Sequence, residues 1–122
     1  MSDSAPASEP ALDVRPSSID GAHVLTVRGE LDVVTAPVLV EAIGSALAAA
    51  PSAIVVDLLG VEFLASAGMS VLFEASQTAT DASTWFGVVA DGPATSRPMK
   101  IVGLDRELRL YVTMDDALRA VG

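Results

Sequence analysis

The chain has 122 residues, enough for a single domain, and its 16 acidic and 7 basic side chains give a net charge of −9. This charge disfavours nucleic acid and anionic membrane surfaces as partners, because both are bound through clustered Lys and Arg. The chain has no cysteine, which excludes disulfide and thiolate chemistry, and its single histidine excludes a His-rich metal site. No apolar run approaches the roughly 20 residues of a membrane-spanning helix, and the N-terminus lacks the features of a signal peptide. The sequence therefore indicates a soluble, cytoplasmic protein.

The N-terminal part predicts a tail followed by a hairpin. Residues 1–10 consist mainly of Ser, Ala, Pro and acidic residues, which predicts a disordered tail before a single domain at residues 11–122. Weak alternation at 11–17 predicts an edge strand, and residues 23–28 predict a second strand. The Asp-Gly pair at 20–21 is a strong signal for the hairpin turn between them.

A turn and a helix are predicted next. Residues 29–32 read Gly-Glu-Leu-Asp, which by itself predicts only a turn with two acidic side chains. Thr35 is then expected to cap a helix that ends near Ala49, because apolar residues recur at helical spacing between them and Pro51 follows.

The middle of the chain carries the clearest signal. Residues 53–56 form a continuous apolar run that Asp57 closes, which is typical of a strand buried on both faces, and we expect this central strand to span 53–58. A loop containing Gly60 is expected next, followed by a helix at 67–79 with Ser66 as its N-cap. A hydroxyl near the positive end of a helix suits an anion, including a phosphate added to the serine itself.

The helix at 67–79 is apolar over more of its girth than one buried face requires. Met69 and Phe73, spaced i and i+4, share a face beside the predicted buried stripe. Two interpretations remain open: a helix sunk deep in the core, or a helix whose second apolar face meets a partner. The predicted stripe consists of Gly68, Val71, Leu72 and Ala75.

The C-terminal part continues the alternation of strands and helices. We expect a strand at 85–90, a short helix at 95–102 closed by Gly103, a strand at 108–112 and a last helix capped by Asp115. This order predicts an α/β fold with a mixed, mostly parallel sheet of about five strands, an N-terminal hairpin and about four helices.

The sequence contains few of the residues and motifs that an enzyme active site would need. Ser66 lies in Ala-Ser-Ala-Gly rather than Gly-x-Ser-x-Gly, and His23 is the only histidine that could act as its base. No phosphate-binding Gly-rich motif is present, so no cofactor is predicted. Asp32, Asp57 and Glu62 could gather near the strand ends, but without His or Cys they make a weak metal site.

The stretch at 54–75 resembles the signature of STAS domains, most closely that of bacterial anti-sigma-factor antagonists. In that family an apolar strand ending in Asp is followed by a loop, by Asp-Ser-Ser-Gly or Asp-Ser-Ala-Gly, and by an apolar helix. Here residues 65–68 read Ala-Ser-Ala-Gly, so Ala65 stands where the family has Asp. Gly-Glu-Leu-Asp at 29–32 and Gly-Leu-Asp at 103–105 match family segments by position, and the resemblance runs from about Val14 to the C-terminus.

The resemblance implies a STAS fold and a regulatory protein that is not an enzyme. It implies an anti-sigma factor with serine kinase activity as the partner: binding releases a sigma factor, phosphorylation of Ser66 ends the binding, and a phosphatase resets the protein. The oligomeric state is left between a monomer and a weak homodimer. The expected partner-binding residues are Asp32, Ala65, Ala67, Gly68, Met69, Leu72 and Phe73.

Alternatives to this interpretation stay open. Ser66 could be a helix cap with no further role, and Ser70 is a fallback acceptor for phosphate. The resemblance equally fits stand-alone STAS proteins that serve as accessory subunits of membrane transport complexes, including bacterial lipid transporters, and such a subunit would need no phosphorylation. Because Ala65 stands where the family has Asp, the transporter-subunit interpretation stays open.

Overall fold

One five-stranded sheet organises the protein, whose computed structural model describes residues 11–121. The predicted tail at residues 1–10 lies outside the described residues. In spatial order, which is also chain order, the strands are β1 (Leu12–Ile19), β2 (Ala22–Leu31), β3 (Ala53–Leu64), β4 (Trp85–Val89) and β5 (Leu110–Tyr111). β1 pairs antiparallel with β2, and the other neighbouring strands are parallel, which confirms the predicted mixed sheet with an N-terminal hairpin.

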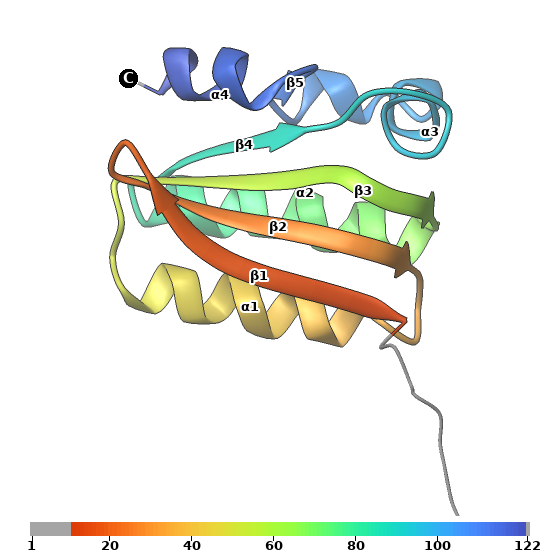
Figure 1. The fold of residues 1–122 in the computed structure, drawn as a ribbon, viewed down its shortest axis with the longest axis horizontal. Helices are drawn as coiled ribbons and strands as arrows, with labels where there is room; N and C mark the ends of the chain where they lie inside the picture. The colour runs from red at the N-terminus through yellow and green to blue at the C-terminus, as the bar shows by residue number, and fades with distance from the viewer. Residues whose placement is uncertain (1–10, 122) are drawn as a thin grey trace, which may run out of the picture.

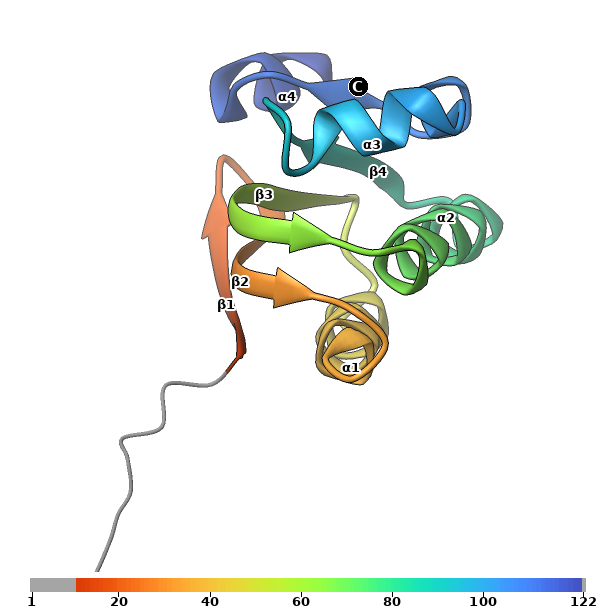
Figure 2. The ribbon, with the colours of Figure 1, turned by 90° about the vertical axis from the view of Figure 1, so that its right-hand side faces the viewer.

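Helices cover both faces of this sheet. Figure 1 shows α1 and α2 running along the strands, and Figure 2 shows that these two helices share one face while α4 lies on the other. Within residues 11–121 the four α-helices are α1 (Ala36–Ala48), α2 (Ser66–Asp81), α3 (Ser96–Ile101) and α4 (Met114–Ala120). The number of helices therefore agrees with the prediction.

β3 lies at the centre of two apolar cores. Its Ile54 and Val56 side chains join the large cluster under α1, α2 and α3, whereas Ala53 and Val55 join a smaller cluster under α4. All four are fully buried, since side chains alternate between the faces of a strand and both faces are covered here. The apolar run is thus a strand buried on both faces, as predicted.

β3 is longer than its sequence indicates. The loop predicted around Gly60 is wrong, because the strand continues to Leu64 through an irregularity in its pairing with β2. At this bulge the Asp57 carboxylate accepts a hydrogen bond from the N–H of Leu59 at 2.9 Å. Asp57 and Gly60 lie close together in sequence, which is typical of a turn, but here they lie at a bulge of a strand that stays paired with β2.

The turn predicted at residues 29–32 is likewise wrong, because β2 runs on to Leu31. Gly29 has a φ of +108°, and a Cβ at this position would collide with the carbonyl oxygen of Ala11. The same carbonyl accepts a hydrogen bond from the N–H of Glu30 at 2.9 Å. Glycine is therefore needed both for the backbone angle and for the close approach of the chain that leads into β1.

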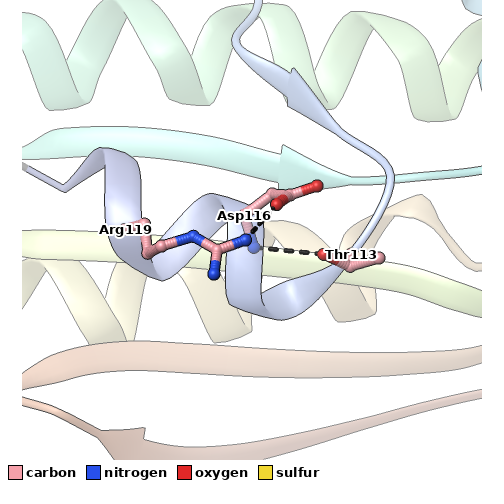
Figure 3. A network of polar contacts seen from close by, with 3 residues as sticks. All are labelled: Thr113, Asp116 and Arg119. Atoms are coloured by element: carbon pink, nitrogen blue, oxygen red, sulfur yellow. Dashed lines mark hydrogen bonds and ion pairs between the residues drawn. The ribbon is translucent and has the colours of Figure 1, made fainter.

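The helix caps differ from those predicted. Asp115 is not the cap of α4: Figure 3 shows Thr113 in this role, and its hydroxyl accepts from the N–H of Asp116 at 3.1 Å. The Asp116 carboxylate in turn pairs with Arg119 at 2.6 Å. Thr35 does occupy the N-cap position of α1, but its hydroxyl makes no capping bond and instead donates to the carbonyl of Glu30 at 2.7 Å.

The C-terminal elements are shorter than expected. The strand predicted at 108–112 is reduced to the two residues of β5, and a 3-10 helix at Leu104–Arg106 was not predicted. Gly103 closes α3 as expected: it has a φ of +79°, and its N–H donates to the carbonyl of Lys100 at 3.0 Å.

Candidate functional site

Ser66 is the first residue of α2 and not its N-cap, which corrects the sequence prediction. The N-cap is Ala65, whose backbone is extended and whose carbonyl accepts from Gly68 N at 3.0 Å and from Met69 N at 3.2 Å. Ala65 has no polar side chain, so no side-chain oxygen caps this helix. The Ser66 hydroxyl is exposed beside the open end of α2.

Backbone pairing brings the Ser66 turn next to Asp32. Leu31 at the end of β2 pairs with Leu64 at the end of β3, and the N–H of Ala65 donates to the carbonyl of Leu31 at 2.9 Å. Figure 2 looks at this end of the sheet, where β2 leads into α1 and β3 leads into α2 side by side. The two sequence motifs, separated by more than thirty positions, therefore meet at one edge of the sheet.

Gly68 lets α2 approach this edge closely. A Cβ on Gly68 would lie 2.5 Å from Cγ and 2.9 Å from Cδ2 of Leu31, and 2.8 Å from Cδ1 of Leu64. Both leucines are buried in the main core and have little room to move. The missing side chain at position 68 thus fixes where α2, and Ser66 with it, begins.

A groove runs from Ser66 along α2 toward the segment that follows α3. Its volume is about 350 Å³. Met69 and Phe73, predicted to share a face, are both half-buried and both line it. The face of α2 that carries Met69 and Phe73 is therefore neither buried in the core nor fully exposed to a partner. The structure lies between the two interpretations that the sequence left open. The lining consists of Ser66, Met69, Ser70, Phe73, Glu74, Val102 and Leu104, none of which is basic.

Other predicted contact residues lie below the surface. Leu72 is fully buried and Gly68 is buried, so both support the site by packing and offer no side-chain surface to a partner. Ala65 and Ala67 are half-buried beside the exposed Ser66. Val71, expected in the buried stripe, is only half-buried and packs against the edge of the core.

The Asp32 carboxylate is bound to its own loop. Its Oδ1 accepts from the N–H groups of Val34 and Thr35, both at 3.0 Å, and lies 3.2 Å from the Thr35 hydroxyl. The N–H of Thr35, followed in effect by that of Val34, holds the pKa of Asp32 below its ordinary value, against the opposing effect of desolvation. Thr35 Oγ1 also accepts from the N–H of Asp32 at 3.0 Å.

This loop presents two apolar side chains that sequence reasoning missed. Val33 is 75% exposed and Val34 is 80% exposed. Two adjacent valines directly after a strand are typical of core residues. Here they are exposed to solvent because they lie in the turn between β2 and α1. A usable signal was present: Asp32 and Thr35 flank the pair at the spacing of a side-chain-stabilised turn.

The geometry disfavours a serine–histidine pair and a metal site. His23 lies near the start of β2, opposite Ile54, and Leu31 is eight positions further along the same strand, a span of about 26 Å. Within residues 11–121 no three His, Cys, Asp or Glu side chains gather as a metal site would require. Asp32 and Asp57 instead accept hydrogen bonds from their own loop and bulge. In the same part of the chain, no helix combines the length and apolar character needed to cross a membrane.

Comparison with known proteins identifies this arrangement. The family model of the STAS domain matches residues 14–117. The chain is 44% identical over 111 residues to the anti-sigma-F factor antagonist RsfB of Mycobacterium tuberculosis, covering 91% of this chain and 90% of that protein. The crystal structure of an anti-sigma factor antagonist from Mycobacterium paratuberculosis superposes with a TM-score of 0.86 at 47% identity, with 97% of each chain covered. The unphosphorylated form of SpoIIAA, at 16% identity and a TM-score of 0.73 over 89% of this chain and 96% of that one, shares the fold.

Proposed function

The chain belongs to the STAS domain family, and from this premise we propose that it acts as a cytoplasmic anti-sigma factor antagonist rather than an enzyme. It binds an anti-sigma factor that also has serine kinase activity, and this binding frees a sigma factor. Phosphorylation of Ser66 by that kinase ends the binding, and a phosphatase restores it. The similarity to RsfB over nearly the whole of both chains supports the partner class.

One observation carries the proposal: an exposed serine lies at the first residue of α2 and lines a groove whose lining is mostly apolar. A kinase can reach this hydroxyl without unfolding the helix. Met69 and Phe73 offer apolar area next to it, as a protein partner requires. The same surface can therefore be both the docking face and the substrate of the kinase.

The groove also explains how a phosphate would act. A phosphate adds about −1.5 to −2 charges at neutral pH. The groove that adjoins Ser66 contains Glu74 and no basic side chain, so this chain provides no cation there to pair with the phosphate. In a closed interface the added charge would have to be desolvated, which weakens binding. A cost of about 1.4 kcal/mol already lowers the affinity tenfold.

The test begins with the protein isolated from its own cells, by intact mass and phosphopeptide mapping. We expect phosphate on Ser66, its loss in Ser66→Ala, and its retention in Ser70→Ala, the matched control from the same groove. The co-purifying anti-sigma factor is then titrated with both variants and with Ser66→Glu. Tight binding of Ser66→Ala and binding weaker by about tenfold or more for Ser66→Glu support the switch.

A transporter subunit predicts a different set of results. The observation in its favour is Ala65: the position directly before Ser66 lacks the acidic residue of the antagonist signature. A protein that stays unmodified under all growth conditions and co-purifies with a transporter ATPase would replace the present proposal.

A further inference from the structure

β1 is a long strand at one edge of the sheet. Within residues 11–121 it pairs with β2 on one side, and no strand lies along its other side (Figure 1). The strand at the opposite edge, β5, has two residues and is too short to pair well with a further strand. The eight-residue β1 is therefore the edge at which a second protein chain can add a strand.

The pairing of β1 with β2 determines which backbone groups of β1 point outward. The N–H of Glu30 donates to the carbonyl of Ala11 at 2.9 Å, and the register of the two strands places these residues opposite each other. In an antiparallel pair, residues that exchange hydrogen bonds alternate with residues whose N–H and C=O point away from the partner strand. The odd-numbered residues of β1 therefore bond to β2, and the even-numbered residues direct their backbone groups to the open edge. The outward-facing positions are Leu12, Val14, Pro16 and Ser18.

The hairpin turn at the other end of β1 agrees with this assignment. Asp20 and Gly21 have positive φ angles of +51° and +83°, as a type I′ turn requires. The residues that flank such a turn, here Ile19 and Ala22, face each other as a hydrogen-bonded pair. Both ends of β1 thus place its odd-numbered residues against β2.

Pro16 occupies one of the central outward-facing positions and is exposed. Proline has no N–H, so at this position it costs β1 no hydrogen bond with β2 but removes a donor from the open edge. A second strand that paired along β1 would meet the pyrrolidine ring where it needs an N–H, and one of its carbonyls would be left without a partner. If two copies paired symmetrically through β1, this loss would occur once in each copy.

We propose that Pro16 prevents β1 from pairing with β1 of a second copy of this chain, and so keeps two sheets from joining edge to edge. The inference is independent of the proposed function, because no residue of β1 lines the groove at Ser66. It concerns the oligomeric state, which the sequence left between a monomer and a weak homodimer. The wild type forms no homodimer through this edge.

The test replaces Pro16 by Val in the full chain, because Val favours strands and restores an outward-pointing N–H. Sedimentation equilibrium compares the self-association of the wild type and Pro16→Val over the same range of concentrations. We expect Pro16→Val to associate at least about tenfold more tightly, because each copy now supplies the donor that the facing carbonyl needs. The matched control is Pro93→Val, which replaces an exposed proline outside the strands and should leave the association at the wild-type level.

A second variant returns proline to the edge at a different position. In Pro16→Val combined with Ser18→Pro, a proline again faces outward, so the association should fall back to within about twofold of the wild type. Amide hydrogen exchange then locates the contact. The outward-pointing N–H groups of Val14 and Ser18 should exchange rapidly in the wild type and be protected in associated Pro16→Val.

The role of Pro16 is overturned if Pro16→Val associates no more tightly than the wild type. It is also overturned if the variant associates while Val14 and Ser18 stay unprotected, since the contact then lies elsewhere, or if the wild type itself forms a dimer that protects these amides. Precipitation of Pro16→Val that Ser18→Pro abolishes would support the proposal, and precipitation that persists would count against it. Binding of the anti-sigma factor enters none of these results, so the proposed function is tested separately.

Discussion

Replacing Gly68 by Ala tests whether close packing sets the start of α2. An added Cβ would meet Leu31 at 2.5 Å and Leu64 at 2.8 Å, both buried. The matched control is Gly44→Ala in α1, where a Cβ would meet nothing within 4 Å. Both substitutions replace a helical glycine, so both gain up to about 1 kcal/mol in helix propensity. Only Gly68→Ala also overpacks the core, which costs about 1–3 kcal/mol.

The two variants should therefore differ in stability, with Gly68→Ala the less stable of the two. Gly44→Ala should raise the free energy of unfolding by up to about 1 kcal/mol, or about 4 °C in Tm. Gly68→Ala should lie about 1–3 kcal/mol below that control, because the shared propensity gain cancels in the comparison. Urea unfolding followed by the fluorescence of Trp85, the single tryptophan, measures both. A Gly68→Ala protein as stable as Gly44→Ala would refute the claim that this packing fixes the position of Ser66.

Three further predictions concern caps and charge. Ala65→Asn should stabilise the protein by about 1 kcal/mol by capping α2, and Ala65→Asp should gain less if its charge is repelled by Asp32; thermal unfolding of both at neutral pH compares them. Thr113→Val should cost about 1 kcal/mol through loss of the α4 cap, measured by urea unfolding, with Thr80→Val, an exposed helical threonine, as the control. Because the folded pKa of Asp32 is lowered, its carboxylate stabilises the fold above its unfolded pKa of about 3.9, and this contribution is lost as pH falls through the folded value. The difference in stability between the wild type and Asp32→Asn should thus shrink between pH 5 and pH 2, and a constant difference would contradict the cause assigned to the pKa.

The sequence predicted the fold where the pattern of apolar residues was unambiguous. The run from Ala53 to Val56 is typical of a strand covered on both faces, as the structure confirms, and the alternation of strands and helices after it leaves few topologies. The prediction from sequence was wrong where polar residues and glycine lie within a strand whose backbone is paired. Asp57 and Gly60 look like a loop because they favour turns, but pairing with β2 overrides that preference.

The local structure around Ser66 was predicted in position but not in detail. Ser66 was placed at the start of a helix, one residue from its actual role, since a preference for caps says nothing about the dihedral angles of Ala65. The Asp32 carboxylate accepts hydrogen bonds from Val34 and Thr35 in its own turn, and this could not be predicted without the three-dimensional positions of those N–H groups.

The helical pattern correctly predicted that Gly68, Leu72 and Ala75 are buried, but it placed the half-buried Val71 in the same stripe. The exact edge of the stripe depends on how α2 rotates over the sheet, which a helical pattern fixes only within about one residue.

The hydrogen bond from Ala65 to Leu31 has an evolutionary consequence. It joins main-chain atoms, so any residue other than proline at position 65 can make it, and the residue at position 31 is equally free in this respect. The side chain before the serine can therefore drift between lineages while the serine stays aligned with the neighbouring strand end. The same independence means that a substitution at position 65 leaves in place the backbone scaffold that presents Ser66.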